Sequence, residues 1–300
     1  MSQQMTRAAE PDRTPATCFE YQRAESWQDA VELLSLWEGE AKILAGGQSL
    51  VPMLNLRLAF PAALIDVNPI PTAEPYVDDG HLVLPALTRH SVLARSELVR
   101  RHAPLLSHAV QFVGNVRVRN RGTVGGSLSH ADPTAEIAAV VLAMGGTITV
   151  LGRNGTRTIP AGDFFVTYLT TALAEDEVVT GVRLPLAGGS SWGFHEVVRR
   201  YSDFATVSVS VAAPEVDPAG LRVVLGGVAD RPLLVGGDLL DPVLQAPDDP
   251  EAARTAATRI AASITPDSDL HGSADHKRHL VAVHTRRLLE QVLGDAGRNA

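Results

Sequence analysis

The sequence predicts an α+β protein built from two domains. The chain has 300 residues, of which 45% are hydrophobic and 20% charged, which is ordinary for a globular protein and long enough for two domains. In its first part, short strands and helices surround two glycine turns. After a glycine-rich break at residues 186–191, which we expect to be the linker, strand-like segments come first and helices follow. That order is typical of an α+β domain in which two or three helices cover one face of a small sheet.

The first helix has a clear start and end in the sequence. Residues 1–16 lack an apolar signal core and are expected to form a disordered polar extension. Ser26 and Asp29 make a start like a capping box, and Gly39 ends the helix. Its apolar face consists of Ala30, Leu33, Leu34 and Trp37.

Further elements follow in a regular order. Strands are expected at residues 41–45, 62–68 and 81–87, helices at 91–101, 102–113 and 133–144, and short strands from 147 to 184. Beyond the linker, strands are expected at 192–200, 206–212 and 221–227, and helices at 251–262 and 273–293.

Composition excludes several classes of protein. The formal net charge of -8 argues against nucleic acid or an anionic membrane as partner. The single cysteine, Cys18, excludes a disulfide framework and an iron–sulfur cluster ligated by the cysteines of this chain. No apolar run is long enough to span a bilayer, and the expected location is the cytoplasm. The G-x-G-x-x-G, G-x-S-x-G, H-E-x-x-H and Cys/His metal patterns are all missing, which leaves a cofactor domain of non-Rossmann type.

The first glycine turn follows the strand at residues 41–45. Consecutive glycines allow positive φ and bring successive N–H groups together, so the turn can bind an anion such as a diphosphate. The candidate binding residues are Ala45, Gly46, Gly47, Gln48, Ser49 and Leu50. The alternative is a simple helix start with Ser49 as N-cap, and both can hold, because a helix N-terminus also favours an anion.

The second glycine turn leads directly into an acidic segment. Its candidate binding residues are Thr123, Val124, Gly125, Gly126 and Ser127. The alternative is a bend between two strands. Asp132 and Glu136 follow, and either could instead cap the helix expected at Pro133. His130 is more typical of a structural histidine than of a proton donor.

The two turns and their flanks resemble one family. The segments "AKILAGGQSLVPMLNLRLAFPAALIDVN" and "RNRGTVGGSLSHADPTAEIAAVVLAMGGTI" are similar to the FAD-binding medium subunits of molybdenum hydroxylases, the xanthine and carbon monoxide dehydrogenase family. Further similarity lies in "TTALAEDEVVTGVRLP", "FHEVVRRYSDFA", "VVLGGVADRP" and the last helix, so that it covers roughly residues 17–293.

The resemblance implies a fold and a set of cofactor contacts. It implies a two-part FAD-binding domain of the vanillyl-alcohol-oxidase type at residues 17–187, with halves of about 17–70 and 71–187, followed by a smaller α+β domain at 191–295. Glu136 is the implied acidic contact to FAD, with Asp132 as second choice. The remaining implied contacts are Val113, Val179, Phe204 and either His195 or Glu196. Two departures stand out: Ser202 replaces a usual glycine, and "DHKRHL" replaces a Tyr-Arg pair.

The same resemblance implies a role in electron transfer. FAD, held non-covalently, would receive electrons from a [2Fe–2S] subunit and pass them to an external acceptor, while a molybdopterin subunit oxidises the substrate. Two alternatives remain. One is a standalone flavoprotein oxidoreductase, for which His130 and Tyr201 are the candidate acid/base residues. The other is a scaffold subunit without FAD, against which the intact glycines argue.

Overall fold

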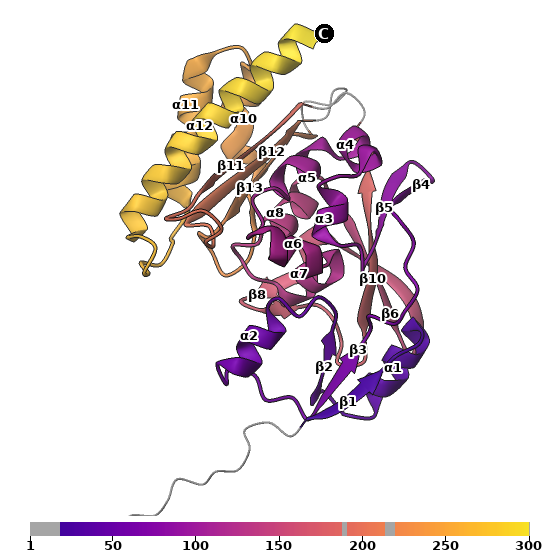
Figure 1. Ribbon diagram of the computed structural model, residues 1–300. Coiled ribbons are helices and arrows are strands. Elements are labelled where there is room, and N and C mark those ends of the chain that lie inside the picture. Colours follow the sequence, from indigo (N-terminus) through magenta and orange to yellow (C-terminus); the bar gives the residue numbers. More distant parts are fainter. Residues whose placement is uncertain (1–18, 188–190, 214–219, 300) are drawn as a thin grey trace, which may run out of the picture.

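The computed structural model describes residues 19–187, 191–213 and 220–299 (Figure 1). The expected disordered extension at 1–16 and the centre of the expected linker, residues 188–190, lie outside the described residues. The mixed helix and sheet architecture predicted from the sequence is confirmed. No helix in the described part of the chain is both long enough and apolar enough to cross a membrane.

The chain begins with a small parallel sheet. Its three strands have the order β1-β3-β2 and are β1 Glu20–Arg23, β2 Ala41–Leu44 and β3 Ala63–Asp66. Helix α1, Trp27–Ser35, starts as predicted, because the Ser26 side chain accepts a hydrogen bond from the Asp29 amide at 3.1 Å. Parallel strands end at the same edge of a sheet, so the segments that follow β2 and β3 lie close together. Short helix α2, Leu50–Asn55, follows β2 and its turn.

A second, antiparallel sheet forms the next part. Its five strands have the order β4-β5-β10-β6-β7 and are β4 Tyr76–Asp78, β5 His81–Pro85, β10 Val178–Pro185, β6 Thr147–Gly152 and β7 Gly155–Pro160. A small separate sheet pairs β8 Phe165–Thr167 with β9 Thr170–Thr171. The associated helices are α3 His90–Leu93, α4 Glu97–His102, α5 Pro104–Ala109, α6 Val116–Arg121, α7 Val124–His130, α8 Glu136–Ala143 and α9 Ala161–Phe164.

Two predicted helices of this part have different boundaries. The helix expected at 91–101 is divided into α3 and α4, because Ser96 leaves the helical conformation and caps α4 by accepting from the Val99 amide. The helix expected from Pro133 begins only at Glu136. Asp132 accepts hydrogen bonds from the Thr134 amide at 2.8 Å and hydroxyl at 2.7 Å, which hold a turn before the helix.

The last part is a four-stranded antiparallel sheet with helices on its outer face (Figure 1). The strands run in the order β11 Ser191–Val197, β12 Val207–Ala213, β13 Arg222–Gly226 and β14 Leu233–Leu234, and the helices are α10 Gly237–Gln245, α11 Pro250–Ser263 and α12 Ala274–Asn299. Helix α10 was not predicted, because Pro242 lies inside it and glycines precede it.

The two faces of this sheet belong to different cores. Val207, Val209 and Val211 pack with the outer helices in one hydrophobic cluster. The alternate side chains point to the other face, where α8 packs against β12 and β13, and Phe194 and Val224 join the core of the preceding part. Helix α8 is therefore shared between the two domains.

Candidate functional site

The two glycine turns lie against each other. An added Cβ on Gly46 would stand 2.3 Å from the carbonyl oxygen of Arg121 and 2.9 Å from the Cα of Gly122. Only glycine fits a backbone approach of this kind. The edge of the parallel sheet at which β2 ends thus meets the segment between α6 and α7, and the predicted pairing of the two turns in one place is present in the structure.

The first turn has unused hydrogen-bond donors. Among the described residues, the amides of Gly46, Gly47, Gln48 and Ser49 donate to no other group. Gly47 has a φ of 71°, which a residue with a Cβ adopts only with strain. Ser49 occupies the N-cap position of α2, but its side chain makes no capping hydrogen bond. The unused amides and this hydroxyl suit an anionic ligand.

The second turn is the start of a helix and not a bend between strands. Thr123 caps α7 by accepting from the Gly126 amide at 3.1 Å. The Val124 amide donates to Thr88 O at 3.0 Å and the Gly125 amide to Ala86 O at 2.8 Å. Fewer amides are thus free here than the sequence suggested.

The two glycines of this turn have different roles. Gly125 is buried, and an added Cβ would stand 2.7 Å from the Cβ of Ala86. Gly126 is exposed, and its only close neighbour is the Thr123 hydroxyl. Gly125 therefore serves the packing of α7 on the end of β5, whereas a Cβ at Gly126 would stand 2.7 Å from the Thr123 hydroxyl that caps α7.

Two buried carboxyl groups lie near each other, one at the start of α8 and one on β11. Removal from water raises the pKa of Glu136, the first residue of α8, to about 7. Burial, followed by repulsion from Glu136, raises the pKa of Glu196 on β11 to about 8. Glu196 Oε2 is buried, and so is the hydroxyl of Ser208, its register partner on β12; neither finds a hydrogen-bond partner in the described part of the chain. Buried polar groups without partners are typical of a ligand site.

His195 and Glu196 point in opposite directions. His195 packs against α12, where its Nδ1 lies 3.2 Å from Nδ1 of His284. Burial lowers the pKa of both imidazoles. Of the two residues that the sequence offered for one cofactor contact, Glu196 faces the glycine-turn domain and His195 faces away from it.

The apolar candidates have different environments. Val113 and Val179 are core residues, 9% and 6% exposed. Phe204 is 66% exposed, in the loop between β11 and β12. In the same loop Ser202 has a φ of 71°, a left-handed backbone conformation that glycine adopts without strain, so a glycine would suit this position.

The two candidate acid/base residues lie in different environments. Tyr201 is 79% exposed. Burial lowers the pKa of His130, at the end of α7. In the described residues, no group of three or more His, Cys, Asp or Glu side chains could hold a metal ion.

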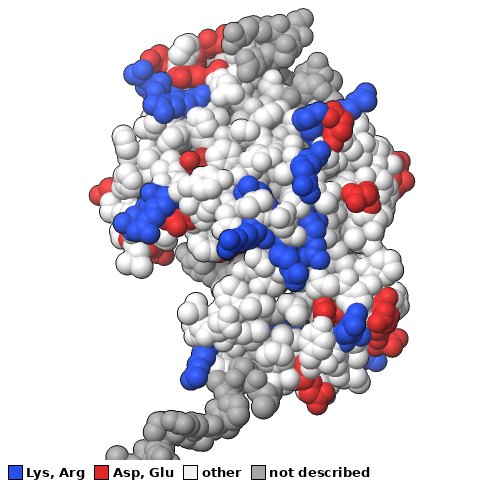
Figure 2. Space-filling model, viewed as in Figure 1, with Lys and Arg blue, Asp and Glu red and all other residues white. Residues whose placement is uncertain are grey.

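The surface charge differs between the middle and the edges of the molecule. Figure 2 shows basic side chains across the helical middle of this face and acidic ones toward its edges. Arg117 and Arg121 of α6 belong to the exposed residues.

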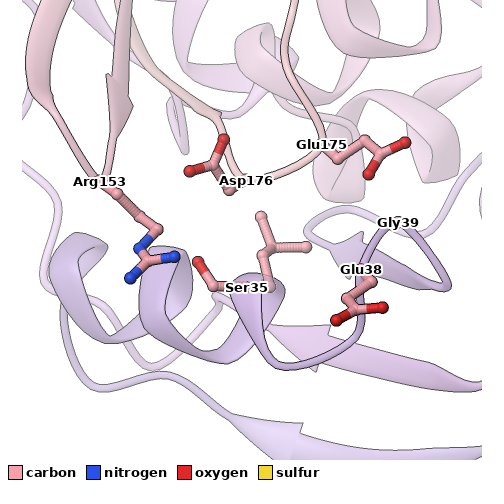
Figure 3. A pocket seen from close by; sticks show the side chains of 7 residues that line it. Ser35, Glu38, Gly39, Arg153, Glu175 and Asp176 are labelled. Carbon is pink, nitrogen blue, oxygen red and sulfur yellow. The ribbon is translucent and has the colours of Figure 1, made fainter.

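A separate cavity of about 390 Å³ lies beside α1 (Figure 3). Its lining includes the carboxylates of Glu38, Glu175 and Asp176 and the guanidinium of Arg153. Three carboxylates repel a diphosphate, so this cavity is not part of the site formed by the glycine turns.

Comparison with known families and structures agrees with this architecture. Residues 17–187 match the family described as "FAD binding domain in molybdopterin dehydrogenase", and residues 192–292 match the "CO dehydrogenase flavoprotein C-terminal domain". The medium subunit of nicotine 6-hydroxylase from Paenarthrobacter nicotinovorans is 35% identical, over 90% of this chain and 95% of that protein. The carbon monoxide dehydrogenase medium chain of Hydrogenophaga pseudoflava is also 35% identical, over 90% of this chain and 96% of its own length.

Solved structures show the same fold. Carbon monoxide dehydrogenase from Hydrogenophaga pseudoflava superposes with a TM-score of 0.85 at 33% identity, covering 93% of this chain and 98% of the other. Quinoline 2-oxidoreductase from Pseudomonas putida 86 superposes with a TM-score of 0.83 at 29% identity, with the same coverage.

Fold and site together define an FAD-binding oxidoreductase subunit. The chain belongs to the FAD-binding medium subunits of the molybdenum hydroxylases, the family of carbon monoxide dehydrogenase. Relatives are named as the medium subunit of a hydroxylase, the medium chain of a dehydrogenase and subunit alpha of a dehydrogenase complex.

Proposed function

We propose that the chain holds FAD non-covalently, receives electrons from an iron–sulfur subunit and passes them to an external acceptor. A partner subunit with molybdopterin would oxidise the substrate. The main support is the set of unused amides at Gly46–Ser49, which lie next to the segment that leads into the second glycine turn. The proposal includes the cytoplasmic location expected from the sequence.

The residues present suit FAD. The amides of the first turn and the Ser49 hydroxyl would hold the diphosphate, and Gly126 would let the ligand approach α7 closely. Glu196 and Ser208 would bind polar groups of the flavin end through buried atoms that are otherwise without partners, and Glu136 would add a third polar group beside them. When bound, FAD supplies the electron-carrying chemistry, and the chain supplies binding, orientation and electrostatics.

The remaining candidate positions have weaker support. Val113 and Val179 are buried in the core, so each would contribute an apolar wall at most. Phe204 is exposed and free to lie over a flavin ring. No observation favours a standalone oxidoreductase, since Tyr201 is exposed and no catalytic partner of His130 is found among the described residues.

Flavin analysis of the purified full chain tests the proposal. The preparation should be yellow, and acid should release intact FAD. Gly47→Val should abolish flavin retention while most of the fold remains, because a Cβ at a φ of 71° distorts the turn. A folded, colourless chain that takes up no added FAD would overturn the proposal. Co-purification from the native host, with metal and flavin analysis, tests the partners.

A further inference from the structure

One arginine connects the two glycine turns. Arg89 donates from Nη1 to the carbonyl oxygen of Arg121 at 2.5 Å and from Nη2 to Oδ1 of Asn68 at 2.7 Å. Asn68 in turn donates from Nδ2 to the carbonyl oxygen of Ala45 at 2.9 Å. Ala45 is the first residue of the first glycine turn, and Arg121 lies two residues before the second. Arg89 and Asn68 therefore join the approaches to both turns.

Hydrogen bonds to Asp66 fix the side-chain orientation of Asn68. Oδ1 of Asp66 accepts from the Asn68 amide at 2.9 Å and from its Nδ2 at 2.5 Å, and Tyr21 donates to Oδ2 of Asp66 at 2.5 Å. Burial alone would raise the pKa of Asp66, but the hydrogen bonds from Tyr21 and Asn68 lower it, so the carboxylate is ionised. Because Nδ2 serves acceptors only, Oδ1 is left to accept from Arg89.

The backbone of Arg89 also lies at the site. Arg89 and Thr123 form an isolated antiparallel bridge, so Arg89 is next to the cap of α7. Burial and then the nearby charge of Arg121 lower the pKa of Arg89, yet a guanidinium remains charged at neutral pH. Two cations thus lie where the turns meet, in a chain of net charge -8.

We propose that Arg89 is a positioning residue for the diphosphate of FAD: its guanidinium fixes the spacing of the two glycine turns and adds positive charge where they meet. This rests on the proposed function, because it takes FAD as the ligand. The planar guanidinium of Arg89 donates to two separate acceptors at fixed angles, a geometry that the ammonium group of lysine reproduces only in part.

The test compares ligands with and without the diphosphate. In the full-length apo-protein, Arg89→Met removes the fork and the charge at nearly constant length. We expect dissociation constants for FAD and ADP to rise roughly tenfold or more, while that of riboflavin stays almost constant. Arg89→Lys should give an intermediate loss for FAD and ADP. Arg95→Met is the matched control, because Arg95 is exposed on the same segment and its side chain makes no hydrogen bond or ion pair within the described residues; only its backbone amide donates, to Val92 O.

A merely structural role gives a different result. If Arg89→Met weakened riboflavin as much as FAD, or weakened neither, the inference would be wrong. If thermal unfolding shows that Arg89→Met is not properly folded, the same comparison of FAD and riboflavin affinities is made with Arg89→Lys. Addition of Arg89→Met to Asn68→Ala should weaken FAD binding by less than Arg89→Met does in the wild type, because the connection through Asn68 is already lost and only the charge and the bond to Arg121 remain to be removed. Failure of the wild-type protein to bind FAD would contradict the proposed function instead.

Discussion

Glu196 of β11 and Glu136 at the start of α8 bring two carboxyl groups together across the boundary between the two domains, close enough for the charge of one to raise the pKa of the other. The backbones of the two domains also meet near this pair, because the amide of Gly227, just after β13, donates to Pro133 O at 3.0 Å. With pKa values of about 7 and about 8, the pair holds a proton at neutral pH.

The pair predicts a pH dependence of stability. Both carboxyls titrate above their ordinary value of 4.5, so between pH 4.5 and 8 these two groups bind more protons in the folded chain than in the unfolded chain. Buried histidines such as His90, whose pKa is lowered to about 4, act in the opposite sense below about pH 6.5. The part of the free energy of unfolding that depends on the carboxyl pair, measured as the difference between the wild type and Glu196→Gln, should therefore fall as pH rises from about 5 to 8. The loss should be at least about 1.4 kcal/mol, the equivalent of one pKa unit.

Denaturant unfolding at a series of pH values measures this loss. Glu196→Gln, which cannot ionise, should flatten the profile. Glu32→Gln, on the exposed face of α1, should leave it unchanged. A profile for Glu196→Gln as steep as that of the wild type would show that the pair does not control stability in this range.

Adjacent glycines of α7 should respond differently to alanine. Gly125→Ala forces a Cβ to 2.7 Å from that of Ala86 in a buried contact, and we expect about 1–3 kcal/mol of lost stability. Gly126→Ala places its Cβ 2.7 Å from the capping hydroxyl of Thr123, which has to shift, so we expect a smaller loss of stability of about 1 kcal/mol or less; it should also weaken FAD binding, because the Cβ occupies space that we assign to the ligand. Thermal unfolding and FAD titration separate the two effects. Unchanged FAD affinity in a folded Gly126→Ala variant would leave this glycine with a role in the helix only.

The motif that contains His195 and Glu196 gives a third prediction. His195→Ala should change the affinity for FAD by no more than roughly twofold, as for a residue outside the site. The absorption maxima of the flavin should shift by no more than about a few nanometres, because the imidazole contacts His284 and not the proposed ligand. Glu196→Ala should change both, since its carboxyl faces Glu136. The opposite pattern, a shifted spectrum in His195→Ala alone, would return the cofactor contact to the histidine.

Local sequence signals predicted much of the fold. Ser26 and the apolar spacing behind it define α1, since a cap and a periodic face depend only on neighbours in the sequence. Helix α10 escaped prediction because Pro242 and the preceding glycines are normally breakers, and packing of Leu240 and Val243 in the second core overrides them.

The site was less accessible to sequence reasoning. The glycine turns stood out, but the hydrogen bonds that occupy the amides of Val124 and Gly125 come from Thr88 and Ala86, far away in the sequence. The connection through Asn68 and Arg89 was missed for the same reason. Its only sequence signal is an Asp and an Asn two residues apart at the end of a strand, Asp66 and Asn68, a pattern that turns also produce.

The last prediction is that the isolated chain is an incomplete enzyme. Its single cysteine cannot ligate an iron–sulfur cluster, and the part of the chain that the structure describes contains no candidate metal cluster. The purified chain, loaded with FAD, should therefore not hydroxylate N-heterocycles or aldehydes, and nicotinamide or artificial donors should reduce its flavin only slowly. Anaerobic stopped-flow absorbance measures the reduction, and the co-purified assembly from the native host is the positive control. Reduction of the flavin by substrate in the single chain at about 1 s⁻¹ or faster, within the usual range of enzymes, would instead establish a standalone oxidoreductase.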